Sequence, residues 1–115
     1  MKYNWTELKL SEMYSKISNY YPEIILSQYN SLLDFTQQAF FSFMGGNPLA
    51  WGKQVVQQMR DISANSDRFR YFLNKDFAHC ATFSDSFYKR GHGKLKLHTW
   101  LSEFINGDNV ANIEP

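Results

Sequence analysis

The sequence predicts an all-α fold, a compact bundle of four main helices and an N-terminal helix joined by short loops. Two observations predict it most directly. The apolar residues of 67–90 recur every three or four positions, and a second stripe with helical spacing runs through 48–63. At 115 residues, the chain is expected to form a single domain (1–115) that needs neither metal nor disulfide to complete its core.

The stretch from Asp67 to Arg90 is expected to be the longest helix. Ser66 is a suitable N-cap and Gly91 a suitable stop, because glycine readily takes a positive φ. One side of the helical wheel would carry six residues at spacings of four, four, three, three and four, with Phe72 at the margin. These six residues are Phe69, Leu73, Phe77, Cys80, Phe83 and Phe87. This helix would bury Phe77.

Two helices are expected before the glycine pair at 45–46. Residues 1–21 form the N-terminal helix, capped by Asn4 or Thr6 and ended by Pro22. Residues 22–44 form the next helix, which is apolar around most of its circumference and therefore lies at the centre of the bundle or against another chain. Pairing of 8–10 with 95–97 as short strands is a minor alternative, because both segments alternate apolar and polar residues.

The sequence Gly45-Gly46-Asn47-Pro48 is the clearest boundary, since glycine ends a helix, asparagine caps the next and proline suits its first position. The helix over 48–63 would bury one narrow stripe, and a short helix ending at Asn106-Gly107 would close the bundle, which spans 22–107. We expect the tail, 108–115, to fray. The two apolar stripes are Trp51, Val55, Met59 and Ile62, and then Leu97, Trp100, Leu101, Phe104 and Ile105.

Asp76 and His79 form the first candidate site. Three positions apart on a helix, they would share one face, which is also the spacing of carboxylate-bridged metal bundles. Such a site needs further carboxylates, whereas Asp34 and Asp61 are isolated. We therefore predict no metal and no cofactor, and a buried polar Asp76 that bonds to His79, a tyrosine or a lysine.

A basic, glycine-spaced segment is the second candidate, a binding site for a small molecule or a phosphate. Such a loop can present cations and backbone N–H groups to an anion. With 12 basic and 11 acidic residues, the whole chain has no general attraction to nucleic acid, which is a possible but less favoured partner. The alternative is a solvated loop after a helix C-terminus. The candidate residues are Lys89, Arg90, His92, Lys94 and Lys96.

The aromatic surplus, ten Phe, seven Tyr and three Trp, is the third candidate. It would supply an interaction surface or an apolar cavity, with an ordinary core as the alternative. We predict a non-enzymatic protein that self-associates, as a homodimer, or docks a protein partner through an aromatic-rich helical face. The sequence offers no convincing catalytic residues. The residues assigned to this surface or cavity are Phe35, Phe40, Phe41, Phe43, Phe72 and Phe83.

The cellular compartment is predicted from the cysteine content and from the lack of targeting or membrane-spanning segments. Cys80 is the only cysteine and cannot form an internal disulfide, which favours a reducing environment. No signal segment opens the chain, and no apolar run approaches the roughly 18 residues of a membrane span. We therefore expect a cytoplasmic protein without a transmembrane segment.

Overall fold

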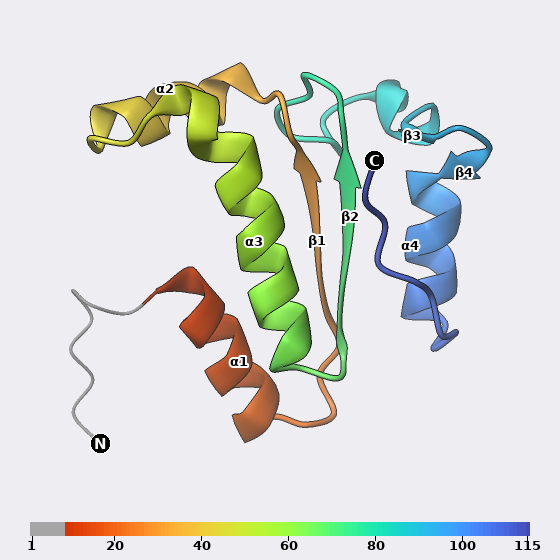
Figure 1. The fold of residues 1–115 in the computed structure, drawn as a ribbon. Helices are drawn as coiled ribbons and strands as arrows, with labels where there is room; N and C mark the ends of the chain where they lie inside the picture. Colours follow the sequence, from red (N-terminus) through yellow and green to blue (C-terminus); the bar gives the residue numbers. More distant parts are fainter. Residues whose placement is uncertain (1–8) are drawn as a thin grey trace.

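The computed structural model describes residues 9–115 and shows a mixed α/β fold, so the predicted all-α bundle is wrong (Figure 1). The proposed caps Asn4 and Thr6 lie outside the described residues. The elements, in chain order, are α1 (Leu10–Tyr20), β1 (Leu26–Ser31), α2 (Phe35–Phe43), the 3₁₀ helix η1 (Pro48–Ala50), α3 (Trp51–Ala64), β2 (Phe69–Asn74), the 3₁₀ helix η2 (Asp85–Tyr88), β3 (Gly91–His92), β4 (Leu95–Lys96) and α4 (Leu97–Ile105).

A small parallel sheet organises the fold. β1 pairs with β2 in a register that places Leu26 opposite Phe69, and α2, η1 and α3 connect the two strands. The chain end lies along the other edge of β2, where the Leu73 N–H donates to the Ile113 carbonyl (2.8 Å) and the Ile113 N–H donates to the Tyr71 carbonyl (2.9 Å). β2 is therefore central, and β1 is at the edge.

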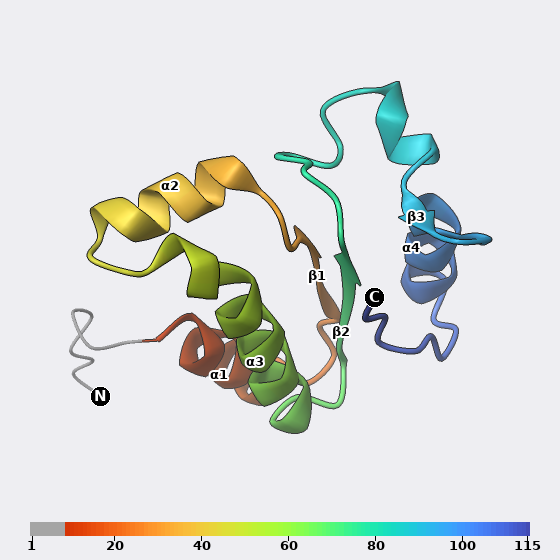
Figure 2. The same ribbon diagram turned by 45° about the horizontal axis from the view of Figure 1, so that its top comes forward.

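Helices cover the two faces of this sheet (Figures 1 and 2). α1 and α3 lie on one side and α4 lies on the other. The stripe predicted for 48–63 is buried on α3, and three residues of the stripe predicted for the last helix are buried on α4. Both helices are thus confirmed. One core cluster contains Trp51, Val55, Met59, Ile62, Phe69, Tyr71 and Leu73, and the other contains Phe72, Leu97, Trp100, Phe104 and Val110.

The predicted helix over 67–90 is wrong, because its first part is β2 and the rest is mostly irregular. β2 is buried on both faces, with Phe69, Tyr71 and Leu73 toward α3 and Phe72 toward α4. A strand buried on both faces forms a continuous apolar run and lacks alternation. Moreover, residues four apart share one side in a helix and also in a strand, so the Phe69 and Leu73 spacing fits both.

The predicted helix over 22–44 is also wrong. β1 occupies its middle, and α2 begins only after Asp34, whose side chain accepts the Gln37 N–H (3.0 Å) as an N-cap. Asp34 is a favourable N-cap residue, and it indicated a helix start inside the stretch 22–44 that was predicted to be one helix. The alternative prediction, that residues 95–97 pair with 8–10 as short strands, also differs from the structure. Leu95 pairs with His92, and Lys96 pairs with Gly91.

The C-terminal residues 108–115 are held against the sheet. Trp100 Nε1 donates to the Ala111 carbonyl (2.8 Å), and Glu114 accepts bonds from Arg60 (2.9 and 2.6 Å) and from the Tyr71 hydroxyl (2.7 Å). Burial and the bond to Glu114 raise the pKa of Tyr71 to about 12. The Arg60 guanidinium, followed by Tyr71, lowers the pKa of Glu114. Together these contacts add the chain end to the outer side of β2.

Candidate functional site

Polar side chains gather where the two parallel strands end. The carboxyl ends of β1 and β2 meet at one edge, β1 continues into α2 on the α3 side, and β2 leads toward η2 and α4 on the other side (Figures 1 and 2). Open α/β sheets form ligand crevices at such switch points. This edge is therefore the first candidate for a site.

Asp76 lies at the centre of a group of polar side chains that we call the strand-end cluster, formed by Asp76 with Tyr29, Asn74 and Arg90. Its Oδ2 accepts hydrogen bonds from the Tyr29 hydroxyl (2.8 Å), Asn74 Nδ2 (2.9 Å) and Arg90 Nη1 (3.3 Å). Burial alone would raise the pKa of Asp76, but the nearby Ser31 and Tyr29 hydroxyls, the Ala78 backbone and the Arg90 charge lower it overall. Asp76 is thus a paired carboxylate that ties the loop after β2 to both strands.

His79 pairs with a different carboxylate. Its Nδ1 lies 2.9 Å from Oδ2 of Asp34, the buried residue that also caps α2. The His79 side chain is 41% exposed. Asp76 and His79, which a helix would have placed on one face, therefore bond to separate partners.

Among the described residues, three buried side-chain atoms at this edge have no hydrogen-bond partner: Ser31 Oγ, Asp76 Oδ1 and Arg90 Nε. Ser31 is close enough to influence the pKa of Asp76, but the two groups do not meet the geometry of a hydrogen bond. A water molecule can serve such atoms. Within residues 9–115, no three His, Cys, Asp or Glu side chains come together in an arrangement that could hold a metal ion.

The basic segment is divided by the fold. Arg90 turns inward to Asp76 and to the Ser86 hydroxyl (Nη2 to Oγ, 3.0 Å), whereas Lys89, His92 and Lys94 are exposed. Lys96 Nζ donates to the Lys89 carbonyl (3.3 Å). The segment forms the β3–β4 hairpin, and phosphate or small-molecule binding by it stays a prediction.

The six phenylalanines singled out in the sequence also separate. Phe72 is fully buried and Phe41 packs at the edge of the α3 core, while Phe83 is 88% exposed on the loop after β2. The remaining three, Phe35, Phe40 and Phe43, are exposed on α2, which has no buried residue. They belong to a larger apolar area.

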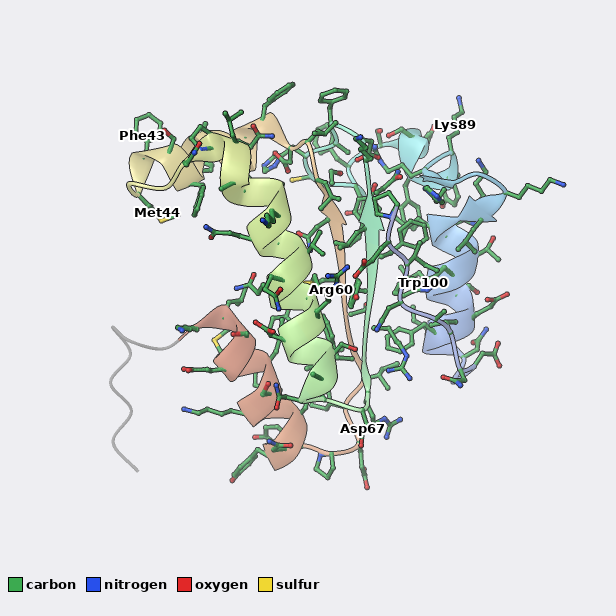
Figure 3. The ribbon with its side chains drawn as sticks, viewed as in Figure 1. Phe43, Met44, Arg60, Asp67, Lys89 and Trp100 are labelled. Carbon is green, nitrogen blue, oxygen red and sulfur yellow. The ribbon has the colours of Figure 1, made fainter. Side chains whose placement is uncertain are left out.

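We define the α2 apolar surface as six exposed side chains. Phe77, which the sequence placed in the core, is 62% exposed and stacks on Phe35 with ring centroids 5.2 Å apart. Phe43 and Met44 lie at the end of α2 farthest from the sheet (Figure 3). Sequence periodicity did not assign Phe77, Met44 and Leu49 to an exposed surface, because their exposure depends on the fold. The full set is Phe35, Phe40, Phe43, Met44, Leu49 and Phe77.

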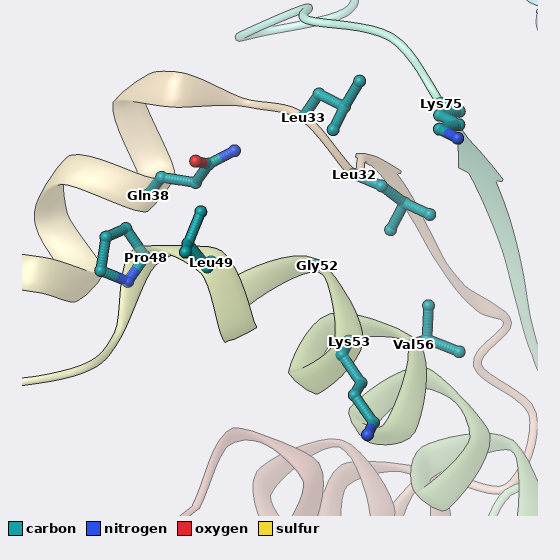
Figure 4. Close-up of a pocket in the computed structure, with 9 residues that line it drawn as sticks. All are labelled: Leu32, Leu33, Gln38, Pro48, Leu49, Gly52, Lys53, Val56 and Lys75. Atoms are coloured by element: carbon teal, nitrogen blue, oxygen red, sulfur yellow. The ribbon is translucent and has the colours of Figure 1, made fainter.

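A groove of about 400 Å³ adjoins this surface, between α2, the start of α3 and the strand ends (Figure 4). Its lining is mostly apolar, with the Gln38 amide and two exposed lysines, Lys53 and Lys75. At its base, Gly52 allows α3 to approach β1, because a Cβ there would lie only 3.0 Å from the Leu32 carbonyl oxygen. The apolar lining is Leu32, Leu33, Pro48, Leu49 and Val56.

No family model matches the chain, nor does any curated protein or solved structure. In the part of the chain that the structure describes, no helix is long and apolar enough to cross a membrane. The α2 apolar surface and its groove are therefore interpreted from their own chemistry.

Proposed function

We propose that the chain is a protein-binding domain whose α2 apolar surface and adjoining groove dock an amphipathic helix of a partner protein. The observation that carries this proposal is the exposure of α2 and the turn after it. Phe43, Met44 and Leu49 are 89%, 79% and 91% exposed, although all three are large apolar side chains. Single exposed apolar residues are ordinary, but several large ones on a short helix and the turn after it are typical of interaction sites.

The size of the surface supports a protein partner. A fully exposed aromatic side chain presents about 200 Å², so the six residues together present on the order of 800 Å². That is about the area that one partner buries in a standard protein–protein interface. A small ligand in the groove alone would leave most of the surface exposed.

The charges beside the surface indicate what the partner carries. Residues 35–52 contain no charged side chain, and the charged groups that line the groove are Lys53 and Lys75. Both lysines are exposed. A helix with an apolar face and flanking acidic residues would complement the phenylalanines with one side and the lysines with its margins.

Peptide titration tests the proposal. The probe is a synthetic amphipathic helix with leucines on one face and glutamates at its margins, and the matched control carries lysines in place of the glutamates. We expect the acidic peptide to bind at least about tenfold more tightly, by fluorescence anisotropy at low salt, because it faces Lys53 and Lys75. The double variant Lys53→Glu, Lys75→Glu should reverse that preference.

A second variant tests whether a loss of peptide binding comes from the α2 apolar surface or from a loss of folding. Because Phe43 and Leu49 are almost fully exposed, the double variant Phe43→Ser, Leu49→Ser should keep the melting temperature and lose at least about tenfold in affinity for the acidic peptide. Equal binding of the two peptides, or binding unchanged by this variant, would refute the proposed function.

The cellular compartment belongs to the same proposal. Cys80 is a free, exposed thiol. We propose that the domain works in the cytoplasm, where such a thiol remains reduced. Alkylation of Cys80 in intact cells, followed by mass spectrometry, would test this, and a persistently oxidised Cys80 would contradict it.

A further inference from the structure

The outer edge of β1 carries backbone groups without partners. The Leu26 N–H donates to the Arg68 carbonyl (3.1 Å) and the Leu32 N–H to the Asn74 carbonyl (2.8 Å). With the parallel register, these bonds show that the even-numbered residues of β1 direct their backbone groups to β2. Ser27, Tyr29 and Ser31 therefore direct theirs to the opposite side.

Almost all of these outward groups are unpaired within residues 9–115. The sheet that contains β1 has only β2 beside it, and the one outward group with a backbone partner is the Ser31 carbonyl, which accepts the Asp34 N–H (3.1 Å). Backbone N–H and C=O groups in proteins are nearly always paired, with protein or with water. An extended chain that pairs with this edge would satisfy these groups.

β1 also lacks the features that protect an edge strand. Edge strands commonly carry lysine, proline or a bulge that discourages pairing with another chain. The sequence of β1, Leu-Ser-Gln-Tyr-Asn-Ser, has no charge and no proline, and its pairing with β2 runs without interruption from Leu26 to Ser31. Nothing in the strand opposes the addition of another one.

We propose that β1 pairs antiparallel with β1 of a second copy of the chain, about a two-fold axis at Tyr29. In this register, Tyr29 faces its own counterpart and Ser27 faces Ser31 of the other copy. These are the residues with outward backbone groups. The Ser31 carbonyl already accepts the Asp34 N–H and would take the Ser27 N–H of the other copy only as a second donor, so the three pairs form about four to six N–H···O bonds. The two sheets join into one with the order β2, β1, β1, β2.

The strand suits its own copy better than an unrelated segment. A two-fold axis places the same surface on both sides, so every donor of the edge meets an acceptor of the same edge. Because β1 is uncharged, no like charges oppose each other. The inward-paired residues Gln28 and Asn30, whose side chains already share a hydrogen bond (3.0 Å), would face each other across the axis and can extend that amide contact.

The proposal is tested with the full chain by sedimentation equilibrium. Ser27→Pro removes an N–H that points outward and takes no part in the β1–β2 pairing, so it should spare the monomer. Ser27→Ala is the matched control, because it keeps that N–H. We expect a wild-type dimer, a similar dimer for Ser27→Ala, and a dissociation constant raised at least about tenfold for Ser27→Pro.

Amide hydrogen exchange gives a readout that does not depend on the proline variant folding. In the wild-type chain, the Tyr29 N–H should exchange more slowly as protein concentration rises, while the Gln28 N–H, bonded within the monomer, should not change. A monomer at all concentrations would overturn the proposal. So would a dimer in which Tyr29 exchange is independent of concentration, since self-association would then use another surface such as the α2 apolar surface.

Discussion

Substitution of Phe72 and Phe77 by alanine separates the observed fold from an all-helical one. Phe72 is fully buried between the layers, with its ring 5.6 Å from that of Trp100 and 5.8 Å from that of Tyr29. Phe72→Ala removes the ring and leaves a cavity, at a cost of about 3–5 kcal/mol in the free energy of unfolding. At 0.05–0.15 kcal/mol per residue, the whole domain has about 6–17 kcal/mol, so the loss is a large fraction.

Phe77 provides the matched control. It is 62% exposed and its ring stacks on that of Phe35, a pair worth about 0.5–1.5 kcal/mol. Phe77→Ala should therefore cost about 1 kcal/mol or less, whereas a buried position on a long helix would cost as much as Phe72. Urea denaturation followed by circular dichroism measures both variants. A loss for Phe77→Ala that equals or exceeds the loss for Phe72→Ala would refute the layer assignment of these residues.

Three further perturbations test separate parts of the structure. The lowered pKa of Glu114, held by Arg60, means that its contribution to stability is present above its ordinary value of 4.5 and is lost as the pH falls through the lower folded pKa. Glu114→Gln should remove this part of the acid dependence, as measured by denaturation between neutral and acidic pH. Gly91→Ala should lower the melting temperature by several degrees, because its Cβ would overlap the Leu95 carbonyl oxygen in the β3–β4 hairpin. Asp34→Ala should cost about 0.5–2 kcal/mol through loss of the α2 N-cap, and an unchanged urea midpoint would contradict that role.

Local signals in the sequence were sufficient for the elements whose apolar stripe faces a single layer. α3 has four buried residues on one side, and Asn47 and Pro48 occupy the cap and first helical position of η1, as the turn motif predicts. α4 likewise buries one side, and Gly107 follows it with φ of 89°. The helical period thus agrees with a start signal before α3 and with a stop signal after α4, and agreement across levels is what makes an element predictable.

β2 could not be recognised in the same way. α3 covers one of its faces and α4 the other, and burial on both faces removes the alternation that identifies a strand. The aromatic residues after it extended an apparent helical period into a loop where Phe77 and Phe83 are exposed. The strand-end cluster was equally hidden, because Tyr29 and Asp76 come together only when β1 and β2 pair.

The segment 22–44 was read as apolar around most of its circumference, and the structure explains that excess in another way. β1 is an edge strand whose first five residues are only partly buried, and α2 has no buried residue at all. The segment therefore contains more apolar side chains than the single chain buries, and a strand with one unpaired edge. Within residues 9–115, no layer covers the α2 apolar surface and no second strand lies at the outer edge of β1. These two deficits call for different complements, a helix for α2 and an extended strand for β1, which is why the two proposed contacts can be tested independently with variants that do not overlap.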